Sequence, residues 1–110
     1  MIVVKTDELI GAALDWAVAK CEGFVQADDP PWEAGYEPFA YSTDWELAGP
    51  IIERERIAIQ FGPLWAAIHH KQLGHPSYGP TPLIAAMRCI VASKLGDTIE
   101  VPDELFQGEK

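Results

Sequence analysis

The chain has 110 residues, a length typical of one domain that buries its own core without disulfides or metal ions. An apolar fraction of 48% and a charged fraction of 23% are ordinary for a folded protein and exclude an intrinsically disordered chain. The net charge of −9 argues against direct nucleic-acid binding, because phosphate contacts need a basic surface. We expect a single domain over residues 1–110 whose surface attracts basic partners.

The sequence also bears on location and redox state. It has no apolar run long enough to span a membrane, and its first residues lack the features of a secretory signal. We therefore expect a cytoplasmic protein that does not contact membranes. Cys21 and Cys89 fall at interior-facing positions of two predicted helices, and we expect both to stay reduced in that compartment.

The N-terminal residues predict a short strand followed by a helix. Residues 2–5 are mostly β-branched, and Thr6 is suited to cap a helix whose first turn is acidic. Apolar residues at spacings of three and four predict that this helix covers residues 7–22, with Asp15 outside the apolar stripe and Gly23 as the stop. The residues of the stripe are Ile10, Leu14, Ala17, Val18 and Cys21.

Residues 24–50 form an acidic, aromatic and proline-rich segment that we expect to be mainly loop. More than half of the aromatic residues of the chain lie within 24–45, so several of them must pack onto the domain or onto a partner. Ser42 or Asp44 could start a short helical turn. The following segment, Ile51 to Arg56, fits a helix and a strand equally well.

The second half predicts a hairpin and a second helix. Alternating apolar residues indicate strands at 57–61 and 64–69, joined through Gly62-Pro63, and residues 71–80 have the composition of a loop. Thr81-Pro82 then gives the start signal of a helix over 82–95, which Gly96 ends. With a short closing strand at Ile99 and Val101, the sequence predicts an α+β fold. We expect a small antiparallel sheet of three or four strands against helices at about 7–22 and 82–95.

Three blocks of the sequence resemble one known family. They are T-D-E-L-I-G-A-A-L-D-W-A-V-A-K-C-E-G (6–23), S-T-D-W-E-L-A-G-P-I-I-E-R-E-R-I (42–57) and G-P-T-P-L-I-A-A-M-R-C-I-V-A-S-K-L-G-D (79–97). In this order they are similar to the NinX family, small proteins of lambdoid and related phages and prophages. The resemblance implies a phage-encoded cytoplasmic accessory protein of uncharacterised function. It transfers no catalytic residue to this chain.

The residues themselves suggest two binding sites, each with a purely structural alternative. In the first, Asp44 and Trp45 lie beside Glu53, Arg54 and Arg56 as an aromatic platform rimmed by charges, suited to a nucleobase or a peptide. Alternatively, Asp44 caps a turn, Trp45 fills the core and the charges form an exposed face.

In the second site, the helix start at Thr81 offers free backbone N–H groups to an anion, with Arg88 nearly two turns further along the helix. The alternative is an ordinary capped helix whose Arg88 pairs with a neighbouring carboxylate.

No motif specifies catalysis, a cofactor or a metal. His69 and His70 point to opposite faces of a strand, so they cannot both ligate one ion without a bulge. We expect no catalytic residue, cofactor or metal site, and therefore a non-enzymatic protein.

Two functions remain. The first is binding of a host or phage protein, basic in character, by the acidic aromatic segment 24–46; a DNA mimic is a special case, and a homodimer is a further expectation. The alternative is binding of a nucleotide-like ligand, with Trp45 or Trp65 stacked on a base and two of Arg54, Arg56 and Arg88 on phosphates. A cavity where a Trp meets two arginines would favour the alternative.

Overall fold

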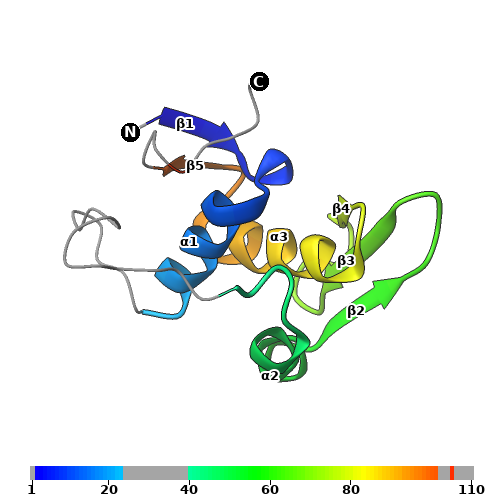
Figure 1. Cartoon of the computed structure of the whole chain (residues 1–110). Helices are drawn as coiled ribbons and strands as arrows, with labels where there is room; N and C mark the ends of the chain where they lie inside the picture. The colour runs from blue at the N-terminus through cyan, green and yellow to red at the C-terminus, as the bar shows by residue number, and fades with distance from the viewer. Residues whose placement is uncertain (1, 24–39, 102–104, 106–110) are drawn as a thin grey trace.

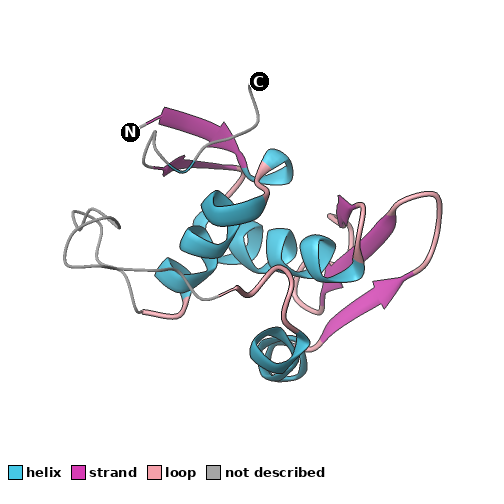
Figure 2. Ribbon diagram, in the orientation of Figure 1, coloured by secondary structure: helices cyan, strands magenta, loops and turns pink. Residues whose placement is uncertain are grey.

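The computed structural model of the protein describes residues 2–23, 40–101 and 105. Within them, two antiparallel sheets and two helices contact one central helix, α3 (Figure 1, Figure 2). In chain order the elements are β1 (Ile2–Lys5), η1 (Thr6–Glu8), α1 (Gly11–Cys21), α2 (Trp45–Glu55), β2 (Ile57–Gln60), β3 (Trp65–His69), β4 (Ser77–Gly79), α3 (Pro82–Leu95) and β5 (Thr98–Val101). The α+β class is confirmed. The structure has two separate sheets where the sequence predicted one, and it has a third helix, α2, besides the two predicted helices.

Helix α3 covers the residues that its start and stop signals predict. The hydroxyl of Thr81 accepts a hydrogen bond from the backbone nitrogen of Ile84 at 3.1 Å, and Gly96 ends the helix with φ of 98°. Most side chains of α3 are buried, and the buried ones lie on every side of the helix, because elements from both halves of the chain surround it. No helix in the described residues is long and apolar enough to cross a membrane.

Helix α1 starts four residues later than predicted. Thr6–Glu8 form a separate 3-10 turn, and Leu9 and Ile10 are extended. Thr6 does not cap a helix: its hydroxyl donates to the carbonyl of Gly96 at 2.6 Å, and its N–H donates to the carbonyl of Asp97 at 2.8 Å. These bonds hold the turn at the end of α3, so the continuous helix 7–22 was wrong in its first turn. Ile10, expected in the core, is exposed.

Asp15 is a second correction in α1. The carboxylate was expected on the exposed side of the helix, but the residue is buried and its Oδ1 accepts from the backbone N–H of Ser42 at 2.8 Å. Burial is also the main cause that raises the pKa of the Asp15 carboxyl above its usual value. The segment around Ser42 covers this face of α1, which the periodicity of α1 alone did not indicate.

Helix α2 shows that the expectation of a loop as far as residue 50 was wrong. It also shows that the ambiguous segment 51–56 is helical up to Glu55. Asp44 caps it, with Oδ1 accepting from the backbone nitrogen of Glu46 at 2.9 Å. Ala48 and Ile51 are buried, and α2 contacts α3. This packing outweighs the hydrogen bond lost at Pro50 inside the helix. The rest of the predicted loop, residues 24–39, lies outside the described residues.

The predicted hairpin is confirmed, with Ile57 opposite His69 and Ile59 opposite Ala67. Strand β4 was missed, because residues 71–80 read as loop by composition. Gly79 in β4 lies so close to α3 that a Cβ there would approach the backbone nitrogen of Ala85 to 2.8 Å. The two terminal strands, β1 and β5, pair antiparallel to form the second sheet as a two-stranded unit.

Candidate functional site

Glu55 is the centre of a polar network that joins four parts of the fold. One carboxylate oxygen accepts from Nε2 of His69 at 3.0 Å, and the other lies 3.0 Å from Nε of Arg54 and 3.4 Å from Nζ of Lys94. Arg54 also donates to both oxygens of Glu22 at 3.0 and 2.7 Å. The hydrogen bond from His69, followed by those from the two cations, lowers the pKa of Glu55 from 4.5 to about 2. The network fixes the end of α2 to β3, to α3 and to the end of α1.

The hydrogen bonds assign the tautomer of His69. Its Nδ1 accepts from the backbone N–H of Lys71 at 3.1 Å, so the ring proton is on Nε2, which donates to Glu55. His70 stacks on His69 with ring centroids 4.7 Å apart, and its Nδ1 donates to the carbonyl of Glu55 at 2.8 Å. Glu55 is thus the partner that the sequence did not reveal for His69. Since both ring nitrogens of His69 are bonded, neither is free to act as a general base.

The other residues of the first predicted site are spread along α2. Asp44 and Trp45 lie at its start, where Trp45 is 54% exposed and therefore does not fill the core. Glu53 is exposed on the same helix. Arg56 follows the helix in a left-handed conformation with φ of 55°. Of the predicted charges, Arg54 is the one that joins the Glu55 network.

Trp65, Thr81 and Arg88 lie on other elements. Trp65 in β3 packs edge to face with Phe61, with ring centroids 5.2 Å apart. Thr81 caps α3 as described. Arg88 donates from Nε to the carbonyl of Leu9 and from a terminal nitrogen to that of Tyr78, both at 2.8 Å. It therefore ties the segment between η1 and α1 to β4. Asp7 and Glu8 interact with its charge, but no described carboxylate forms an ion pair with it, so the alternative in which Arg88 pairs with a carboxylate is not observed.

Cys21 and Cys89 are both free. Burial raises the pKa of the Cys21 thiol to about 12 and that of Cys89 to about 11. Both thiols are protonated at neutral pH, so neither is an activated nucleophile. Within the described residues, no group of three or more His, Cys, Asp and Glu side chains is placed to hold a metal ion.

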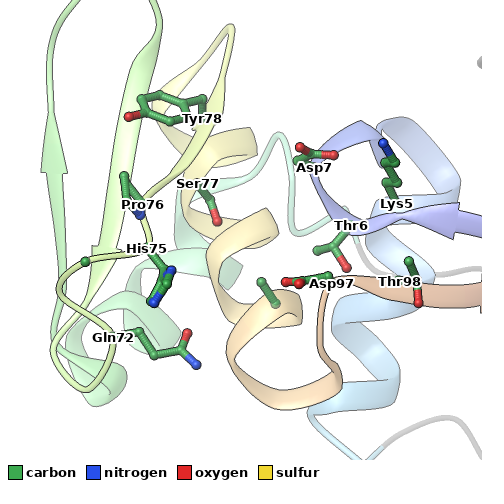
Figure 3. A pocket seen from close by; sticks show the side chains of 12 residues that line it. Lys5, Thr6, Asp7, Gln72, His75, Pro76, Ser77, Tyr78, Asp97 and Thr98 are labelled. Carbon is green, nitrogen blue, oxygen red and sulfur yellow. The ribbon is translucent and has the colours of Figure 1, made fainter.

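The structure also contains a cleft of about 790 Å³ between the two sheets (Figure 3). Lys5, Asp7, Asp97 and Thr98 line the wall formed by the end of β1, by η1 and by the start of β5. Gln72, His75, Ser77 and Tyr78 line the opposite wall, which is the loop before β4 and β4 itself. Ala92 of α3 also lines the cleft. Its volume is in the usual range for small-ligand sites.

The chain also matches a known protein family, and the matched residues can be compared with the two sites. Over residues 5–94 the chain matches the family described as Bacteriophage P22, NinX. It belongs to the NinX family. The matched range contains the whole Glu55 network, whereas Asp97 and Thr98 of the cleft follow it. None of the curated proteins compared with this NinX-family chain matches it.

No residue of the two predicted sites lines the cleft of this NinX-family protein. Its walls come mainly from three separate segments, 5–7, 72–78 and 97–98, and none of these segments carries a recognisable motif. The Glu55 network was easier to predict from the sequence, because Glu55 and His69 both lie in segments that the sequence singled out. The missing information was that α2 is a helix, which decides the direction of the Glu55 side chain.

Proposed function

We propose that this phage accessory protein acts by binding a host or phage protein through the β2–β3 hairpin. The observation that carries the proposal is a run of twelve uncharged residues, 57–68, in a chain with a net charge of −9. At the tip of the hairpin, Phe61 is 77% exposed and Leu64 is 52% exposed. Phe61 also contacts the ring of Trp65. We call Phe61, Pro63, Leu64 and Trp65 the hairpin surface.

The chemistry of the hairpin surface supports binding of a protein. Exposed aromatic and aliphatic side chains that touch one another mark interaction sites on soluble proteins, and aromatic residues dominate the binding energy of interfaces. Strand β2 is an edge of its sheet and carries none of the charged side chains that commonly block pairing with another chain. The acidic surface elsewhere would steer a basic partner toward the protein and speed association.

The expected contribution of the segment 24–46 is only partly visible, because residues 24–39 lie outside the described residues. In the described part, Trp45 is 54% exposed and Tyr41 is buried. Trp45 is therefore a second candidate contact on α2. The nucleotide alternative has less support, since the residues that line the cleft include neither a Trp nor an Arg. Catalysis has no support from His69, whose ring nitrogens are both bonded.

Affinity capture with matched surface variants tests the proposal. The variants are Phe61→Ser and Leu64→Ser, and the control is Val3→Ser, because Val3 is an equally apolar side chain, 67% exposed on the other sheet. Immobilised wild-type protein is exposed to lysate of infected host cells, and the retained proteins are identified by mass spectrometry. We expect a partner that the wild type and Val3→Ser retain and that each hairpin variant loses by tenfold or more, about 1.4 kcal/mol.

Circular dichroism must show that all variants are folded. Retention that is equal for the control and the hairpin variants would contradict the proposed surface, and retention of no specific protein by the wild type would contradict partner binding. Sedimentation of the purified chain distinguishes a second copy as the partner, because self-association then appears without lysate and is lost in Leu64→Ser.

A further inference from the structure

The cleft between the two sheets has an electronegative wall. Asp7 and Asp97 both line it, and no described residue forms an ion pair with either carboxylate. Asp97 also follows the C-terminal end of α3, where the helix dipole adds partial negative charge. Lys5 lines the same wall without forming an ion pair in the described residues. Among the residues that line this wall, two carboxylates stand against one lysine, and Arg88, outside the cleft, interacts electrostatically with Asp7.

On the opposite wall lies Ser77, a mostly buried residue whose hydroxyl has no hydrogen-bond partner among the described residues. Ser77 is 9% exposed, and its side chain forms no hydrogen bond with a described residue. Figure 3 shows its hydroxyl turned toward the space between the walls. Ser77 faces inward because it pairs with the buried Ala67 of β3, so the register of the sheet fixes its direction. The hydroxyl is open to the cleft and makes no hydrogen bond with a described residue, so a polar atom of a ligand bound there can bond to it.

From these two walls we infer that the cleft binds an organic cation, an ammonium or guanidinium group. The cation lies against Asp7 and Asp97, and a polar atom of the same ligand bonds to the hydroxyl of Ser77. The side chain of Gln72, also on that wall, supplies a further donor and acceptor. An anionic ligand would meet the two carboxylates and is therefore disfavoured.

An organic cation fits better than a metal ion. No three His, Cys, Asp and Glu side chains in the described residues converge as metal ligation requires. An alkylammonium or guanidinium group needs only one or two carboxylates and neutral acceptors around it. The same chemistry is available from a free amine and from a basic side chain of a partner protein.

Titration of the full chain with two probes tests this inference. The probes are spermidine, a free amine, and N-acetyl-argininamide, which reproduces a basic side chain. Amide chemical shifts measured by NMR follow each titration. We expect saturable shifts at residues 5–7, 72–78 and 97–98. Saturation by spermidine alone identifies a free amine, saturation by the arginine derivative alone identifies a partner side chain, and either result supports a cation site.

Three variants separate a specific site from general attraction by an acidic protein. Asp97→Asn keeps the shape of the side chain and is expected to weaken binding about tenfold, as for loss of a charged hydrogen bond. Ser77→Ala is expected to weaken it by about threefold, as for a neutral one. The control is Glu53→Gln, which removes the same charge from an exposed position on α2 and should change the affinity less than about twofold.

Absence of saturable shifts with both probes would overturn the inference. So would equal weakening by Asp97→Asn and Glu53→Gln, because binding would then follow the net charge alone. The side chain of Asp97 makes no hydrogen bond in the described residues, so folding should tolerate Asp97→Asn, and circular dichroism checks this. Leu64→Ser should leave the titration unchanged, so the titration tests the cleft separately from the protein-binding role of the hairpin surface.

Discussion

Replacing Glu55 by Gln tests the polar network that fixes α2. The pKa of Glu55 falls from 4.5 to about 2, first because of the hydrogen bond from His69 and then because of Arg54 and Lys94. A shift of this size corresponds to about 3 kcal/mol of stability near neutral pH. The side chain of Glu55 is 15% exposed, but those of Arg54 and Lys94 are 51% and 37% exposed, so solvent screens part of the interaction. We therefore expect Glu55→Gln to lower the free energy of unfolding by about 2 kcal/mol.

The pH dependence of this loss follows from the direction of the shift. A carboxyl group with a lowered pKa in the folded state contributes stability above its unfolded pKa and loses it as the pH falls through the folded pKa. The difference between the wild type and Glu55→Gln should thus be full at about pH 6, about half at pH 3, and small near pH 2. Urea denaturation of both proteins across this range, followed by circular dichroism, measures the difference directly.

The control for Glu55→Gln is Glu53→Gln, the same change two residues earlier on the exposed side of α2. It should change the free energy of unfolding by less than about 0.5 kcal/mol. A loss in Glu55→Gln that stays constant from neutral pH to about pH 2.5 would refute the electrostatic reasoning. Such a result would mean that the substitution acts through packing, because packing does not depend on the charge of the carboxyl group.

Substitutions at three further positions test local features of the fold by urea denaturation. Gly79→Ala should lower the free energy of unfolding by about 1–3 kcal/mol, because the new Cβ lies 2.8 Å from the backbone nitrogen of Ala85. Arg56→Gly should raise it by about 0.5–1 kcal/mol, since glycine relieves the left-handed conformation at φ of 55° and this exceeds the added entropy of the unfolded chain. Asp15→Ala should cost about 1–3 kcal/mol by leaving the N–H of Ser42 unpaired, whereas Asp15→Asn keeps an acceptor and should cost much less.

Each of these substitutions has an outcome that contradicts its reasoning. A neutral Gly79→Ala would mean that β4 can move away from α3. Destabilisation by Arg56→Gly would indicate that the arginine side chain contributes more than its backbone costs. Equal losses in both variants of Asp15 would show that the negative charge, and not the acceptor, is what the Ser42 segment requires.

The sequence alone determined the elements whose signals are local. The bounds of α3 followed from Thr81-Pro82 and Gly96, and the β2–β3 hairpin followed from alternation around Gly62-Pro63. Asp44 was identified as a candidate cap in the same way. The three sequence blocks likewise indicated the NinX family, which the match over residues 5–94 shows. Such signals work because caps, turns and periodicity act over a few neighbouring residues.

Tertiary structure decided what depends on contacts between distant segments. Helix α2 forms through a Gly-Pro pair because its apolar side chains pack against α3, and Thr6 bonds to Gly96 and Asp97 in place of capping a helix. The partner of His69 and the walls of the cleft were likewise set by packing, since their residues meet only after the sheets close around α3. Local propensity is worth a few tenths of a kcal/mol per residue, so burial of an apolar face outweighs it.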